Sequence, residues 1–140
     1  MPEGHFPQPT DPLPIAEKSA EGLAQEFEAG ISAAFLRANP DSREALEMLG
    51  HALTRAGRHS EALDVDRRLV QLQPDNAFAH YNLACSLSNM GNVEEALGAL
   101  ETALKLGYDD LSFMEKDPDL ARVRRDPRYR RLLEKGKRHK

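Results

Sequence analysis

The sequence contains an internal repeat, and this repeat restricts the possible fold more than any other feature. Residues 43–76 align with residues 77–110 without a gap. The matching pairs are Leu49-Gly50 with Leu83-Ala84, Gly57 with Gly91, Glu61-Ala62-Leu63 with Glu95-Ala96-Leu97, and Leu72 with Leu106. A repeat period of this length indicates stacked units, each of which needs its neighbours to bury its apolar face.

The composition indicates that these units are helical. The chain has no Trp, only 6% aromatic residues, and a body rich in Ala, Leu, Glu and Arg. These residues favour helices that pack through small and aliphatic side chains, and strand signals are nearly absent. A chain of 140 residues can also bury a substantial core, so one all-α domain is expected.

Both units resemble the tetratricopeptide repeat family. Its pattern has a Leu-small pair in the first helix, Gly at the turn, Ala in the second helix and Pro-Asp after it. Gly50 and Ala84 leave room for close helix packing, and Gly57 and Gly91 permit a left-handed helix end. The resemblance implies an α-α superhelix, a right-handed stack of helical hairpins with two repeats plus N- and C-terminal capping helices.

The first repeat departs from the family pattern in its second helix. Asp66 stands where a large apolar residue usually packs, and Leu69 stands where Ala is usual. In the second repeat, Gly107-Tyr108 replaces the expected Pro. We expect Asp66 to be partly exposed, with its carboxylate close to Arg67 or Arg68.

The N-terminal region divides into a leader and a helix. Residues 1–16 form the predicted leader, extended and flexible because five of the nine prolines lie there. Residues 17–38 are predicted to form one amphipathic helix that covers the first repeat. Its apolar residues recur every four positions, at Leu23, Phe27, Ile31 and Phe35.

The C-terminal region, residues 111–136, is predicted to close the other end. Asp117-Pro118 and Asp126-Pro127 each place a capping carboxylate before a Pro at the first helical position. We expect helices near 111–116, 118–124 and 127–136, followed by a basic tail at 137–140. The expected apolar face consists of Leu120, Val123, Tyr129, Leu132 and Leu133. Residues 107–134 resemble the repeat end-of-group segment of small bacterial proteins, which implies a bacterial origin.

The family resemblance implies a function in protein binding. First helices of such repeats line a concave groove, in which members of the family hold peptides. The implied groove positions are Glu44, Glu47, His51, Thr54, Arg55, Phe78, Tyr81, Asn82, Cys85, Ser88 and Asn89. Asn82 stands where peptide-binding members hydrogen-bond a ligand backbone. The expected function is a non-catalytic module that binds a peptide or helix of an unidentified protein.

The groove does not suit an acidic chaperone tail of the EEVD type. Members that hold such tails use a clamp of Lys, Asn and Arg, of which only Asn82 is present. Glu44 and Glu47 would repel an acidic peptide. A ligand with basic and aromatic or aliphatic residues is therefore expected.

No pattern in the sequence indicates catalysis, a metal or a cofactor. The five histidines form no i, i+4 pair and have no carboxylate in ligand spacing, and phosphate-binding and nucleophile motifs are absent. Cys85 is expected to be an inert small residue, and a single Cys suits the reducing cytoplasm. We read no secretory signal and no membrane span.

The C-terminal region leaves two further functions open. Residues 121–140 carry 10 of the 19 Lys and Arg but only two of the 23 Asp and Glu. Such charge can bind nucleic acid or an anionic surface, or lie against the acidic body of the same chain. The candidate anion contacts are Arg122, Arg124, Arg125, Arg128 and Arg131. Nucleic acid is the less favoured partner, and the last alternative is self-assembly of a monomer or weak homo-oligomer by repeat stacking.

Overall fold

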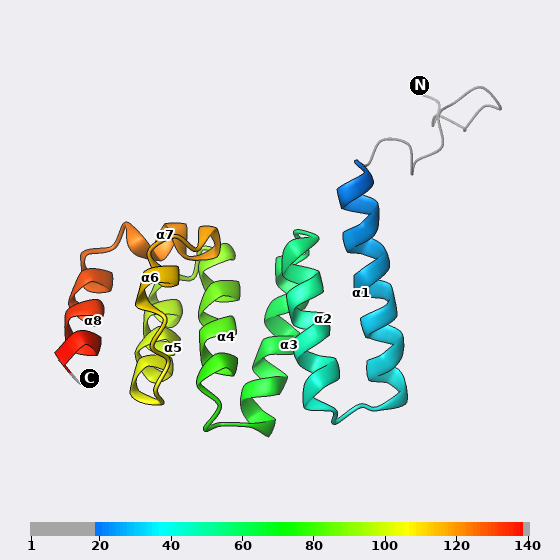
Figure 1. Ribbon diagram of the computed structural model, residues 1–140, viewed down its shortest axis with the longest axis horizontal. Helices are drawn as coiled ribbons and strands as arrows, with labels where there is room; N and C mark the ends of the chain where they lie inside the picture. The colour runs from blue at the N-terminus through cyan, green and yellow to red at the C-terminus, as the bar shows by residue number, and fades with distance from the viewer. Residues whose placement is uncertain (1–18, 139–140) are drawn as a thin grey trace, which may run out of the picture.

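The computed structural model describes residues 19–138, which form a row of antiparallel helices (Figure 1). The helices are α1 (Ala20–Ala38), α2 (Arg43–Arg55), α3 (His59–Leu72), α4 (Ala77–Asn89), α5 (Val93–Lys105), α6 (Leu111–Met114), the 3-10 helix η2 (Pro118–Leu120), α7 (Ala121–Arg124) and α8 (Pro127–Arg138). Each long helix packs against the next one in the sequence, so the expected all-α stack of hairpins is confirmed. The expected leader, 1–16, lies outside the described residues.

The repeat period extends beyond the two aligned repeats. Helices α2, α4 and α6 begin at 43, 77 and 111, and helices α3, α5 and α8 begin at 59, 93 and 127. The C-terminal segment is therefore a third unit in the same register. Its first helix is divided into α6, η2 and α7 because Pro118 interrupts it. At the other end, α1 ends at 38 and α3 ends at 72, one repeat period apart, so α1 has the register of a second helix.

Local signals in the sequence set the ends of the helices. Gly57 and Gly91 have φ angles of 76° and 81°, the left-handed conformation predicted for both turns. Asp117 accepts a hydrogen bond from the backbone N of Asp119 at 3.0 Å, and Asp126 accepts one from the backbone N of Arg128 at 2.9 Å. Both Asp-Pro pairs thus act as the predicted caps.

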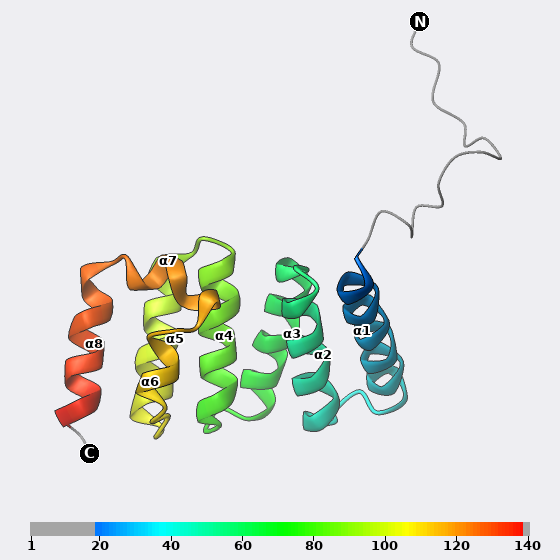
Figure 2. The ribbon, with the colours of Figure 1, turned by 45° about the horizontal axis from the view of Figure 1, so that its top comes forward.

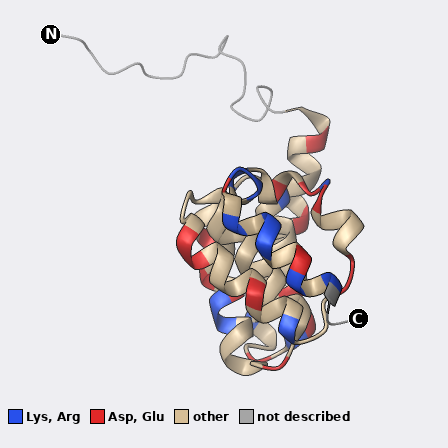
Figure 3. Cartoon of the chain, turned by 90° about the vertical axis from the view of Figure 1, so that its left-hand side faces the viewer, with Lys and Arg blue, Asp and Glu red and all other residues tan. Residues whose placement is uncertain are grey.

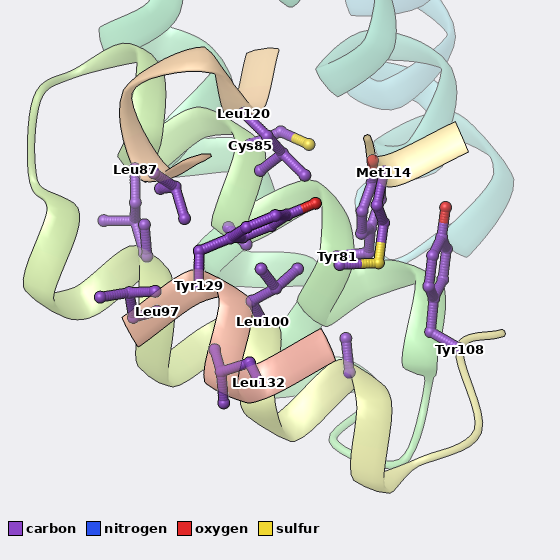
Figure 4. Close-up of a cluster of buried hydrophobic side chains, with 14 of the residues drawn as sticks. Tyr81, Cys85, Leu87, Leu97, Leu100, Tyr108, Met114, Leu120, Tyr129 and Leu132 are labelled. Carbon is purple, nitrogen blue, oxygen red and sulfur yellow. The ribbon is translucent and has the colours of Figure 1, made fainter. Parts of the chain in front are cut away.

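The largest core cluster joins the second repeat to the C-terminal segment. Leu100 of α5, Leu120 of η2 and Val123 of α7 are completely buried. Figure 4 shows the ring of Tyr129, from α8, lying among the leucines of this cluster. The predicted apolar face is confirmed, since Leu120, Val123, Tyr129, Leu132 and Leu133 are all buried.

Helix α1 covers the first repeat with a different face from the predicted one. Ala29 and Ser32 are buried against α2, and Ala33 and Leu36 pack beside them. The large residues point away: Phe27, Ile31 and Phe35 are 71%, 52% and 45% exposed. The predicted helix is present, but its apolar row does not cover the repeats, because small residues allow α1 to approach α2 closely. Figure 2 shows α1 at the end of the row, with α2 and α3 on one side only.

No helix within 19–138 combines the length and the apolar character that a membrane crossing needs.

Candidate functional site

The first helices of the two repeats, α2 and α4, carry the predicted groove residues, and two cavities lie along them. The larger one, about 1000 Å³, lies between α2, the start of α4 and the turn that follows α3. Among the predicted residues, it is lined by Glu47, His51, Phe78 and Asn82. The second cavity, about 420 Å³, lies further along the same surface and shares His51, Phe78 and Asn82.

Four of the predicted groove residues line neither cavity. Arg55 turns toward α1, where it forms an ion pair with Glu28 at 3.0 Å. Asn89 donates a hydrogen bond to Asp119 at 3.1 Å, and Glu44 contacts Arg43 at the start of α2. Ser88 is completely buried. Seven of the eleven predicted residues thus line the two cavities, and the other four lie outside them.

The C-terminal segment restricts access to the part of the groove on α4. Tyr81 and Cys85 line the second cavity but are only 5% and 6% exposed, because the residues around η2 lie against α4. The hydroxyl of Tyr81 donates a hydrogen bond to Asp117 at 2.5 Å, and its ring stacks on Tyr108 with centroids 4.2 Å apart. Tyr81, Cys85 and Ser88 therefore support the groove from below and offer a ligand little surface.

Phe78 is the most exposed large side chain of this surface, at 67%. Its ring and that of Tyr108 form a T-shaped pair with centroids 5.7 Å apart, and Phe78 lines both cavities. Asn82 lies one turn further along α4 and is partly exposed. An exposed aromatic ring beside a carboxamide provides apolar contact area and hydrogen bonding at one place.

Asp66 is buried, contrary to the expectation of a partly exposed side chain. It is 3% exposed, and its Oδ2 accepts a hydrogen bond from Ser86 at 2.5 Å. The nearby arginines face elsewhere: Arg67 pairs with Glu95, and Arg68 pairs with Asp41. Desolvation raises the pKa of Asp66 to about 6, and the hydrogen bond from Ser86 opposes this. The sequence did not indicate this partner, because it lies on the next helix, α4, and in the other repeat.

Cys85, Asp117 and Asp119 form a cluster that the spacing in the sequence did not reveal. Their ligand atoms lie within 4.8 Å of one another. Each carboxylate already accepts hydrogen bonds. Asp117 accepts them from Tyr81 and from the backbone N of Asp119, and the carboxylate of Asp119 accepts one from Asn89. Burial raises the pKa of the Cys85 thiol, so the neutral form is favoured over the thiolate that binds metals. The cluster is a hydrogen-bonded support for the C-terminal segment.

The predicted anion contacts differ in their surroundings. Arg124 donates to the backbone oxygens of Met114 and Asp117 at 2.8 and 2.6 Å, which fixes the C-terminal segment. Arg128 pairs with Asp126 at 2.9 Å and with Glu94 of α5 at 2.6 Å. The other members, Arg122, Arg125 and Arg131, are exposed. Figure 3, viewed from the α8 end, shows acidic and basic residues interleaved around the stack.

Residues 16–103, more than half of the chain, match the protein family described as anaphase-promoting complex, cyclosome, subunit 3. Among curated proteins, a segment of 96 residues is 34% identical to a chloroplastic protein of Arabidopsis thaliana, covering 66% of this chain and 27% of that protein. A segment of 71 residues is 38% identical to the peroxisomal targeting signal receptor of Saccharomyces cerevisiae, covering 51% and 12%.

A third relative is the human cell division cycle protein 16 homolog, 38% identical over 65 residues, which cover 46% of this chain and 10% of that protein. The chain thus spans about a quarter or less of the length of these relatives. The likeness concerns the repeats, and a shared repeat fold does not carry over the function of a whole protein.

Proposed function

Because this chain belongs to the tetratricopeptide repeat proteins, with more than half of its length in the family described as anaphase-promoting complex, cyclosome, subunit 3, we propose that it binds an extended peptide of a partner protein along the concave surface of α2 and α4. Proteins of such repeats are in general protein-interaction modules, and no catalytic function is proposed. The site we propose comprises Glu47, His51, Thr54, Phe78 and Asn82, with Tyr81 and Cys85 beneath them.

One observation carries this proposal: Phe78 is exposed at the point where the two cavities meet, beside Asn82. A large apolar ring in water favours a partner that covers it, and aromatic side chains carry much of the energy of protein interfaces. The carboxamide of Asn82 can donate to and accept from the backbone of an extended peptide.

Selection from a random peptide library tests the proposal. Peptides enriched by the wild-type protein are expected to bind roughly tenfold more weakly to the Phe78→Ala/Asn82→Ala variant, because an aromatic anchor and a backbone contact are lost. Fluorescence anisotropy with the selected peptides measures the change. Met90→Ala is the matched control, since Met90 is exposed at the end of α4 but lines neither cavity. Failure to enrich any peptide would contradict the proposal, as would equal affinity of the peptides for the wild type and the Phe78→Ala/Asn82→Ala variant.

A second candidate function, self-association, is favoured by the exposed apolar row of α1. In the repeat register, Ile31 and Phe35 correspond to Val65 and Leu69 of α3, which pack in one cluster with Leu46 of α2. The row on α1 therefore corresponds to the face of α3 that packs against α2, the first helix of the same repeat. Within the described residues, α1 has no such partner on this face.

A second copy of α1 fits this face by the spacing of its apolar residues. In an antiparallel pair with a two-fold axis at the level of residue 29, Phe27 of one copy lies at the level of Ile31 of the other. One helix pair buries a small area, so we expect a weak dimer.

A charge placed in the apolar row tests the antiparallel dimer. Phe27→Glu and Ile31→Glu are each expected to weaken dimerisation several-fold, because each variant would bury a carboxylate in the contact, as measured by analytical ultracentrifugation over a concentration series. A monomer at all concentrations would reject self-association. A wild type that is monomeric, but dimerises once residues 1–18 are removed, would show instead that the N-terminal segment covers the row.

A further inference from the structure

The floor of the second cavity is a buried carboxylate. Asp66 of α3 lies behind α2 and α4 and still lines the cavity, because Gly50 of α2 has no side chain. A Cβ atom at Gly50 would lie 2.7 Å from Oδ1 of Asp66. While Oδ2 accepts a hydrogen bond from Ser86, Oδ1 accepts none from the described residues. One oxygen of the Asp66 carboxylate therefore faces the cavity and can accept a further hydrogen bond.

The second repeat shows that the fold does not require this arrangement. In the repeat register, Ala84 corresponds to Gly50 and Leu100 corresponds to Asp66. Ala84 and Leu100 are completely buried and apolar, as is usual for a helix crossing. A buried carboxylate at position 66, where the second repeat has Leu100, costs the first repeat packing and solvation energy. Such a cost at one place in a periodic structure points to a function at that place.

Further acidic and aromatic groups line this cavity, beside His51, Thr54, Asn82 and Cys85. Asp110, Asp117 and Asp119 contribute carboxylates, and Phe78, Tyr108 and Phe113 contribute rings. Among the residues that the structure describes, no Lys or Arg lines this cavity. Carboxylates attract a cation directly, and the faces of aromatic rings attract it through their quadrupole.

We infer that this cavity takes up the cationic side chain, Lys or Arg, of the peptide that lies in the groove, with Oδ1 of Asp66 as its deepest acceptor. A volume of about 420 Å³ is in the range of small ligand sites and accommodates one long side chain. The inference rests on the proposed peptide groove for its biological ligand. It assigns the ligand a chemical class, a segment with one basic residue placed between α2 and α4.

Titration with butylguanidinium, which mimics an Arg side chain, tests the cavity apart from any peptide. In NMR spectra of the full chain, the amide signals of Gly50 and Ser86 are expected to shift and saturate at millimolar probe concentrations. Asp66→Asn keeps the shape of the side chain but removes its charge, and it should raise the dissociation constant at least fivefold. Butanol serves as the neutral control probe. Equal, non-saturating shifts in wild type and Asp66→Asn would overturn the inference.

Peptide pools with one fixed residue separate this inference from the proposed groove. The wild type should prefer pools with fixed Lys or Arg over a norleucine pool by several-fold, and Asp66→Asn should lose that preference. If peptides bind without any such preference, the inference fails and the groove stands. If butylguanidinium saturates but no pool binds, the cavity stands and the groove fails. Gly50→Ala, whose new Cβ would contact Oδ1, should behave like Asp66→Asn.

Discussion

Asp66→Asn is expected to remove a pH dependence of about 3 kcal/mol from the free energy of unfolding. The pKa of Asp66 rises from 3.8 to about 6 on folding, because the carboxylate loses most of its contact with water. The folded state therefore binds this proton more tightly than the unfolded state does. Stability from this group is greatest below pH 3.8, falls as the pH rises toward 6, and stays low above it. Urea denaturation at pH 4 to 7 measures the difference between wild type and variant.

The comparison isolates Asp66 because all other titrating groups are common to both proteins. Those that face the same cavity are His51, Tyr81, Cys85, Tyr108, Asp110, Asp117 and Asp119. Hydrogen bonds from Arg128 lower the pKa of Asp126, so this carboxylate changes the stability of both proteins equally, and at lower pH. Parallel stability curves from pH 4 to 7 would show that the Asp66 carboxylate is not desolvated.

Leu120→Ala is expected to lower the free energy of unfolding by about 2 to 5 kcal/mol. Leu120 lies in η2, is completely buried, and belongs to the cluster that joins this segment to the second repeat. The truncation leaves a cavity between the segment and the helices beneath it. Since small domains have a total stability of about 5 to 15 kcal/mol, such a loss would be a large fraction. Thermal and urea denaturation of both proteins provide the measurement.

Leu106→Ala is the matched control, because Leu106, at the end of α5, is 36% exposed and should cost less than about 1 kcal/mol. Two separate unfolding transitions in the wild type, or a loss at Leu120 as small as that at Leu106, would contradict the prediction. Separate transitions would mean that the C-terminal segment unfolds independently of the repeats, and a small loss at Leu120 would mean that its packing contributes little to stability.

The features that sequence reasoning predicted well are periodic or local. The match between residues 43–76 and 77–110 identified the hairpin stack, since it depends only on which residues recur. The left-handed turns at Gly57 and Gly91 and the caps at Asp117 and Asp126 depend on residues within a few positions of one another. No knowledge of distant contacts was needed for any of them.

The features that were missed depend on contacts between distant residues. The row at Phe27, Ile31 and Phe35 marks an apolar face, but periodicity does not tell whether this chain covers it. The burial of Tyr81 depends on Asp117, which is distant in the sequence. The division of the third unit by Pro118 also hid its register, which would have been visible had residues 111–138 been aligned with the two repeats as well.

The register of α1 makes the two ends of the stack different. At one end, α8 presents charged and exposed residues, Arg130, Arg131, Glu134 and Lys135, on the side away from the core. At the other end, α1 exposes the apolar row and has the register of a second helix that lacks a first helix within the described residues. Extension of this array is therefore directional: a single first helix placed before α1 would meet a complementary apolar surface, whereas a hairpin placed after α8 would meet a surface suited to water.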